Sequence, residues 1–167
     1  MPKKGKQRNG PKVGAKGPDF ALKDQDGNEV RLADLRGKRV LLSFHPLAFT
    51  GVCTKQMKAL ERGMDRFERL GVVPLGLSVD AWPSKHAWAK DMGVRRLRIL
   101  ADFHPKGAVA KRVGVYLDDK GISGRANVLL DGSGRVVWFR LYDIPELPDI
   151  KEVFAAIRRS EGQEGGG

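Results

Sequence analysis

The chain has 167 residues, 41% of them hydrophobic, and a single cysteine. This is the length of one domain, and the apolar content is sufficient for one hydrophobic core. One cysteine excludes an intramolecular disulfide, a Cys-X-X-Cys dithiol motif and a cysteine-rich zinc site. It also indicates a reducing compartment, and the aliphatic runs are too short to cross a bilayer. We therefore expect a soluble, cytoplasmic protein with no membrane segment.

The formal net charge of +11 is unevenly distributed along the chain. Residues 1–17 are rich in Gly, Lys and Pro and hold few apolar side chains, so burial cannot offset the entropy lost on ordering them. We predict a disordered basic arm over residues 1–17, a folded domain over 18–160 and a flexible C-terminus over 161–167. The basic residues before the first acid, Asp19, are Lys3, Lys4, Lys6, Arg8, Lys12 and Lys16.

Apolar periodicity and turn residues predict an α/β domain with a central mixed β-sheet flanked by helices. The longest helical stripe runs from Cys53 to Phe67, and Gly71 ends it. Turn dipeptides predict an N-terminal β-hairpin at Asp26-Gly27 and a second hairpin near Gly132. In chain order, the predicted elements are strands at 20–22, 30–32 and 39–44, a helix at 50–71, a strand at 72–79, a helix at 83–93, a strand at 97–101, a helical turn at 107–112, strands at 125–130 and 136–142, and a helix at 149–158.

Cys53 lies where a predicted strand gives way to a predicted helix. The first turn of a helix exposes unpaired backbone N–H groups, which favour a thiolate over a thiol. A buried structural cysteine, on the same stripe as Met57, is the alternative. Thr50 can cap this helix, or its hydroxyl can reach the sulfur one turn later. Pro46 can turn the chain, or its ring can shield a thiol from water.

The spacing Pro46-X-X-X-Thr50-X-X-Cys53 resembles the active-site motif of peroxiredoxins. From Phe44 to Cys53 the chain is similar to the one-cysteine branch typified by alkyl hydroperoxide reductase E. The resemblance runs in order, without large gaps, from Val13 to Arg158. It continues in Leu77-Ser78-Val79-Asp80, in residues 99–110, in Val113-Gly114-Val115-Tyr116 and in residues 125–131.

The resemblance implies a thioredoxin-like fold and a thiol-dependent peroxidase that acts on hydrogen peroxide and organic hydroperoxides without a metal or other cofactor. It implies that Cys53 is the peroxidatic cysteine, that Thr50 binds the peroxide, and that Pro46 shields the site. Arg125, which would otherwise be interpreted as an exposed charge at a strand end, is implied to pair with the sulfur. Gln56 stands where many relatives carry Glu, and its neutral amide can hydrogen-bond Arg125 without forming an ion pair.

Four further residues are candidates for the walls of the substrate pocket: His45, Phe49, Val52 and Trp82. His45 is adjacent to Pro46, and Phe49 and Trp82 could instead lie at a subunit interface. The three histidines show no metal-ligand spacing, so we expect no metal site.

The chemistry requires more than an acidic thiol. A thiol with a pKa of about 8.5 is only about 3% thiolate at pH 7, and a pKa of about 6 gives about 30-fold more. The less basic sulfur is a weaker nucleophile by about 13-fold, so the reaction rate gains only about twofold from the lower pKa. Thr50, Arg125 and the backbone N–H groups of Val52 and Cys53 are therefore expected to stabilise charge in the transition state.

The single cysteine and the family resemblance also define the expected partners. The sulfenic acid formed on Cys53 has no second cysteine in the chain to resolve it, so an external low-molecular-weight thiol or a thioredoxin- or glutaredoxin-like protein must reduce it. The resemblance further suggests a homodimer.

Two other function classes fit parts of the sequence. A thioredoxin-like binding module could hold nucleic acid or another polyanion through its basic arm. The arm lacks interleaved aromatic residues, so we expect such binding to be weak and non-specific at most. A peroxiredoxin-like thiol redox sensor would react with peroxide but turn over slowly with every reductant.

Overall fold

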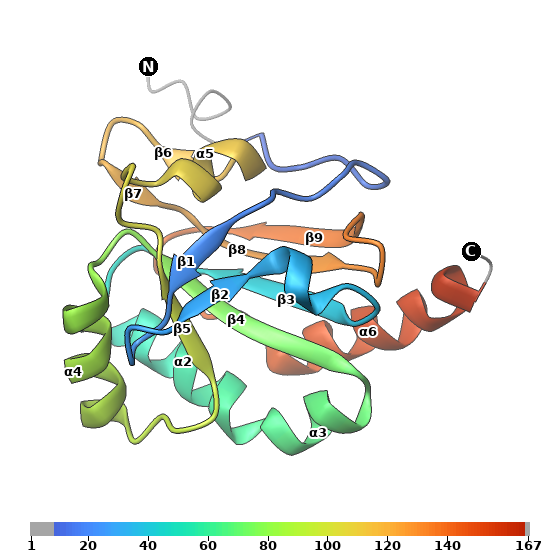
Figure 1. The fold of residues 1–167 in the computed structure, drawn as a ribbon, viewed down its shortest axis with the longest axis horizontal. Coiled ribbons are helices and arrows are strands. Elements are labelled where there is room, and N and C mark those ends of the chain that lie inside the picture. The colour runs from blue at the N-terminus through green and yellow to red at the C-terminus, as the bar shows by residue number, and fades with distance from the viewer. Residues whose placement is uncertain (1–8, 166–167) are drawn as a thin grey trace.

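A computed structural model describes residues 9–165, with side chains up to Glu161. Its centre is a five-stranded sheet in the order β5-β4-β3-β8-β9, and two small hairpins, β1-β2 and β6-β7, lie outside it (Figure 1). The strands are β1 (Ala21–Lys23), β2 (Glu29–Arg31), β3 (Arg39–Phe44), β4 (Val72–Ser78), β5 (Arg98–Ala101), β6 (Tyr116–Leu117), β7 (Ile122–Ser123), β8 (Arg125–Leu130) and β9 (Val136–Tyr142). The helices are η1 (Leu32–Leu35), α2 (Gly51–Arg62), α3 (Met64–Arg69), α4 (Trp82–Met92), α5 (Ala108–Val113) and α6 (Ile150–Gly165).

The sheet is mixed, as the order of predicted elements indicated. Strand β4 pairs in parallel with both β3 and β5, whereas β8 is antiparallel to β3 and to β9. Every residue of β3 is buried, because this central strand has neighbours on both edges and helices or a hairpin on both faces. The carboxyl ends of β3 and β4 therefore meet at one edge of the sheet, directly before α2 and α4.

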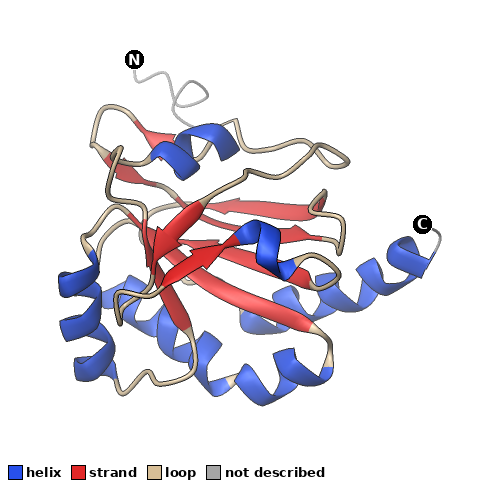
Figure 2. Cartoon of the chain, viewed as in Figure 1, coloured by secondary structure: helices blue, strands red, loops and turns tan. Residues whose placement is uncertain are grey.

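Two hydrophobic cores lie on the two faces of the sheet. Alternate residues of a strand point to opposite faces, so Leu41 joins one core while Val40 and Leu42 join the other. Helices α2, α3, α4 and α6 cover the Leu41 face, and the β1-β2 hairpin, η1 and α5 cover the opposite face (Figures 1 and 2). The core on the Leu41 face contains Cys53, so the predicted active site is built on the face of the sheet that the four helices cover.

The predicted single helix over residues 50–71 is two helices. Helix α2 ends at Arg62 and α3 begins at Met64, with Gly63 between them at φ −88° and ψ 1°. A Cβ atom at Gly63 would lie 3.2 Å from the rings of Phe67 and Phe154. Phe154 of α6 lies close to this glycine, and the apolar stripe continues on both sides of the break.

The predicted disordered arm over residues 1–17 needs correction. Residues 1–8 lie outside the described part of the chain, but later residues pair with the fold. The N–H groups of Gly10, Gly14 and Gly17 donate to the carbonyls of Gly114, Val136 and Gly134, at 3.0, 2.7 and 2.8 Å. Backbone bonds order this segment, whose large apolar side chain, Val13, is 63% exposed. A Cβ atom at Gly17 would lie only 2.7 Å from the Gly134 oxygen. The segment covers part of the β9 edge of the sheet.

The C-terminal helix is longer than predicted. Helix α6 runs to Gly165, beyond the predicted end at Arg158, so the predicted flexible C-terminus is helical over residues 161–165, while residues 166–167 lie outside the described chain. The short β6-β7 hairpin was also not predicted. Within the described residues, no helix is both long and apolar enough to traverse a bilayer.

Candidate active site

Cys53 lies in the first turn of α2, just beyond the loop that follows β3, and its side chain is 1% exposed. The helix begins here because Thr50 adopts an extended conformation, with φ −98° and ψ 155°, at the N-cap position. The Thr50 hydroxyl donates to the carbonyl oxygen of Leu47 at 2.8 Å. A hydroxyl has one hydrogen, so in this conformation Thr50 does not donate to the sulfur, and its oxygen remains an acceptor. The side chain makes no capping bond with the N–H groups of α2.

Arg125 contacts the sulfur from the first position of β8. Its side chain is buried, and Nη1 lies 3.4 Å from Sγ of Cys53 and 2.7 Å from Oε1 of Gln56. The other side of the guanidinium, through Nε and Nη2, donates to the carbonyl oxygen of Ile144 at 2.9 and 2.6 Å. Arg125 and Cys53 are therefore in contact although they are 72 positions apart in the sequence. Gln56 and Ile144 hold the guanidinium from its two sides.

Gln56 links this arginine to the central strand. It lies three residues after Cys53, on the same face of α2, and it is buried. While Oε1 accepts from Arg125, Nε2 donates to Oγ of Ser43 at 2.8 Å and to the Phe44 carbonyl at 3.2 Å. The amide thus uses both of its ends, and it adds no charge beside the sulfur.

The loop before α2 carries the other predicted residues of this region. Pro46 is buried and Val52 is half-buried, whereas Phe49 is 56% exposed and has a positive φ of 66°. A positive φ is rare for a bulky residue and marks a backbone conformation that the surroundings enforce. The Phe49 ring packs against Trp88, with 6.3 Å between centroids.

Trp82 is not brought to Cys53. It lines a separate cavity of about 530 Å³ with Phe103 and His104, beside the β1-β2 hairpin. The tryptophan beside the site is Trp88, which is fully buried. Its Nε1 donates to Oγ1 of Thr54 at 3.1 Å, next to Cys53 in the chain. Trp88 was not among the predicted site residues, and it lies on the buried side of α4.

A buried polar chain behind the loop was missed by the sequence prediction. Nε2 of His45 lies 3.1 Å from Nζ of Lys85, and Lys85 also donates to Oγ of Ser78. Ser78 donates to Asp80, whose Oδ2 accepts from the backbone N–H of Ala48 at 2.9 Å. The chain of bonds therefore returns to the loop that carries Pro46 and Thr50. One signal was available: Lys85 precedes Trp88 and Met92 by three and seven residues, on the buried stripe of α4.

Burial alters the protonation of this chain. It lowers the pKa of Lys85 from 10.5 to about 7, against the opposing attraction of Asp80, Cys53 and Asp102. Burial, and after it the charge of Lys85, lowers the pKa of His45 well below 6.5. His45 is therefore neutral at neutral pH, and its Nε2 can accept a hydrogen bond from the Lys85 ammonium.

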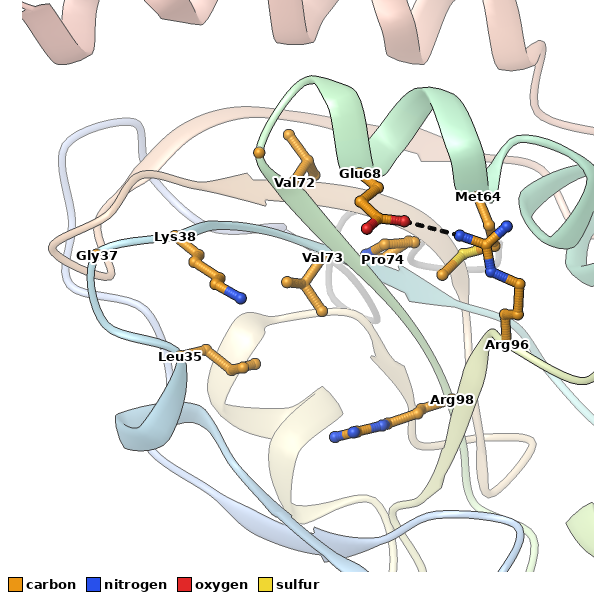
Figure 3. Close-up of a pocket in the computed structure, with 11 residues that line it drawn as sticks. Leu35, Gly37, Lys38, Met64, Glu68, Val72, Val73, Pro74, Arg96 and Arg98 are labelled. Carbon is orange, nitrogen blue, oxygen red and sulfur yellow. Dashed lines mark hydrogen bonds and ion pairs between the residues drawn. The ribbon is translucent and has the colours of Figure 1, made fainter.

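Two cavities of the molecule lie away from the sulfur. One of about 560 Å³ is formed by residues at the amino ends of β3, β4 and β5, opposite to the end that carries Cys53 (Figure 3). Lys38, Val73 and Arg98 line it, and Arg96 forms an ion pair with Glu68 at 2.9 Å. Over the described part of the chain, no three His, Cys, Asp or Glu side chains gather in a way that could hold a metal ion.

The AhpC/TSA family matches residues 13–139, most of the chain. The chain belongs to this family. Alkyl hydroperoxide reductase E of Mycobacterium tuberculosis is 38% identical over 138 residues, which cover 82% of this chain and 90% of the relative. Peroxiredoxin-2 of Pongo abelii is 31% identical over 156 residues, which cover 88% and 87%.

Solved structures of AhpC/TSA proteins have the same fold. The reduced 2-Cys peroxiredoxin of Plasmodium vivax has a TM-score of 0.85 and 30% identity, with 92% of this chain and 83% of that chain covered. AhpC of Enterococcus faecalis, at 22% identity, has a TM-score of 0.86, with 94% and 97% covered. The solved structures confirm the predicted thioredoxin-like fold. The family model and the relatives confirm membership of the peroxiredoxin family and the enzyme class, a thiol-dependent peroxidase.

Proposed function

We propose that the Cys53 thiolate reduces hydrogen peroxide and organic hydroperoxides. The observation that carries this proposal is the 3.4 Å contact between Nη1 of buried Arg125 and the only sulfur of a cysteine in the chain. The thiolate attacks the terminal peroxide oxygen, an S–O bond forms as the O–O bond breaks, and the electron pair leaves on an alkoxide or hydroxide that takes up a proton. Cys53 becomes a sulfenic acid.

Arg125 and the start of α2 stabilise the charge that moves during this step. The guanidinium is permanently charged and is already held by Gln56 and Ile144, so it needs little reorganisation when charge develops on the oxygens. The first N–H groups of α2, at Val52 and Cys53, lack partners within the helix and point toward its N-terminus.

Thr50 and Pro46 complete the proposed site. The Thr50 oxygen can accept a hydrogen bond from the peroxide while the Thr50 hydroxyl continues to donate to the carbonyl oxygen of Leu47. Pro46 is buried beside His45 and limits the access of water to the sulfur. His45, Phe49 and Val52 are proposed to border the peroxide, and Trp82 is placed outside this set because it lines a different cavity.

The reductant is proposed to be an external thiol. The chain has one cysteine, so a low-molecular-weight thiol or a thioredoxin- or glutaredoxin-like protein must attack the oxidised sulfur. Because the Cys53 side chain is 1% exposed, a protein reductant requires the loop and the first turn of α2 to open locally.

We also propose a cytoplasmic homodimer. Leu47 and Phe49 are large apolar side chains of one loop, exposed at 37% and 56%, which supports an association surface. The single cysteine supports a reducing compartment. Binding of nucleic acid by the basic residues near the N-terminus is proposed to be weak and non-specific at most, and most of these residues lie outside the described chain.

Stopped-flow mixing of the reduced protein with several peroxides, followed by tryptophan fluorescence, tests the proposed reaction. The wild type should react much faster than free cysteine, and Cys53→Ser should not react. Arg98→Ala, in the cavity at the far end of the sheet, is the control and should retain the wild-type rate. A wild-type rate no faster than that of free cysteine would remove the proposal, and fast oxidation with slow turnover by every reductant would favour a thiol redox sensor.

A further inference from the structure

The second buried cation of the site is Lys85. Its side chain is fully buried on α4, although lysine is among the residue types least often buried. Its ammonium donates to two neutral groups, Nε2 of His45 and Oγ of Ser78, and reaches Asp80 only through the Ser78 hydroxyl. Burying a charge is costly unless the charge is compensated, so this arrangement requires a reason.

The groups that face Lys85 come from every element packed around it. His45 follows β3, Ser78 and Asp80 are at the end of β4, Asp102 follows β5, and Cys53 begins α2. Cys53 and the two acids attract the ammonium and favour its charged form. The charge of Arg125 acts on His45, whose pKa it lowers. Of the three anions Asp80, Asp102 and the Cys53 thiolate, the proposed reaction consumes only the thiolate.

Lys85 also contacts the helix of Cys53 through Trp88. Its Nζ lies 5.7 Å from the centroid of the Trp88 ring, and the same indole donates to Thr54, the residue after Cys53. The centroid of the His45 ring is 5.2 Å from that of Trp88. The ammonium is therefore joined to the sulfur region by His45, by Trp88, and by the chain of bonds that ends at Ala48.

We propose that Lys85 is a positioning residue for Cys53: it holds the loop before α2 through His45 and Ser78–Asp80, and it supplies the thiolate with a second positive charge besides Arg125. This inference rests on the proposed function, in which the thiolate is the nucleophile. Because coupling between two sites is reciprocal, the thiolate must favour the charged form of Lys85 as much as Lys85 favours the thiolate.

The reciprocity gives a test with two independent parts. In the first, Lys85→Met replaces the ammonium with an apolar side chain of similar length, and the thiolate fraction is followed by ultraviolet absorbance against pH. The thiolate fraction at neutral pH should fall by about threefold to tenfold, and the rate with hydrogen peroxide should fall with it. Above the pH at which Lys85 loses its proton, the variant and the wild type should converge. Lys90→Met, at an exposed position of the same helix, is the matched control and should change neither quantity.

The second part remains valid if Lys85→Met does not fold. With Trp82 and Trp138 replaced by Phe in both proteins, the fluorescence of Trp88, which contacts the ammonium, reports the titration of Lys85, and its midpoint should be lower in Cys53→Ser than in the protein that keeps Cys53. A rate lowered equally at every pH in Lys85→Met would show a structural role only and overturn the proposal. An unchanged fluorescence midpoint in Cys53→Ser would also overturn it. In either case, rapid reaction of the wild type with peroxide would leave the proposed function intact.

Discussion

Arg125 and Lys85 are two buried cations near one sulfur, and they are held in different ways. Arg125 contacts Sγ directly, and a carbonyl and an amide oxygen fix its guanidinium. Lys85 stands one layer further back, bonded to the neutral groups His45 and Ser78. A guanidinium stays charged at every pH at which proteins fold, whereas burial brings the pKa of Lys85 to about 7. The first cation is therefore constant, and the second depends on pH.

Removing the constant cation should have the largest effect. Arg125→Ala deletes the donor at the sulfur and leaves Gln56 and Ile144 without their partner, so the rate with peroxide should fall by about 100-fold. The loss should exceed the change in thiolate fraction, measured in the same variant by ultraviolet absorbance. A rate that followed the thiolate fraction alone would show that Arg125 has no role in the transition state. Arg98→Ala, which changes an exposed arginine on the distant edge strand β5, serves as the control.

The pH-dependent cation should be visible in stability. Unfolded Lys85 keeps its proton up to about pH 10.5, but the folded protein releases it near 7, so between these values the unfolded state binds more protons. Stability conferred by this position therefore rises with pH across that window. The unfolding free energy of the wild type, relative to Lys85→Met, should increase by about 2 kcal/mol from about pH 7.5 to about pH 9. Urea unfolding at several pH values measures it, and parallel curves for the two proteins would contradict a depressed pKa of Lys85.

The smallest effect is expected from the amide between Arg125 and the strand. Gln56→Glu places a carboxylate on Nη1 of Arg125, beside the thiolate, so the ionised sulfur is less favoured and the rate at neutral pH should fall by about threefold. Lys55→Gln changes the net charge by the same amount at an exposed position of α2 and should leave the rate unchanged. If both variants lowered the rate equally, net charge and not the position beside Arg125 would be responsible.

Local features of the sequence predicted most of the fold. Strand β3 was predicted at its observed bounds because its apolar run is limited by Gly37 on one side and Pro46 on the other. The break at Gly63 was missed, and the contact of this glycine with Phe154 of α6, about 90 residues away along the chain, leaves no local signal. Residues 10–17 were missed for a related reason, since backbone bonds to β9 leave no apolar signal.

The site was predictable only where a motif carried it. The Pro46, Thr50 and Cys53 spacing and the family resemblance brought Arg125 to attention, and the structure places it at the sulfur. Lys85 has no such motif. A lysine in a helix is ordinarily solvated, and only the tertiary meeting of the β3 and β4 ends encloses this one.

The sole cysteine is almost completely enclosed in the first turn of α2, and this makes the protein its own reporter of local opening. An alkylating reagent cannot reach the sulfur until that turn and the preceding loop separate from the core. The alkylation rate, divided by the rate for an unhindered thiolate and by the thiolate fraction measured for the same variant, therefore measures the equilibrium between closed and open helix at one defined position. No probe has to be introduced, and every variant of Arg125, Gln56 or Lys85 can be compared on the same scale.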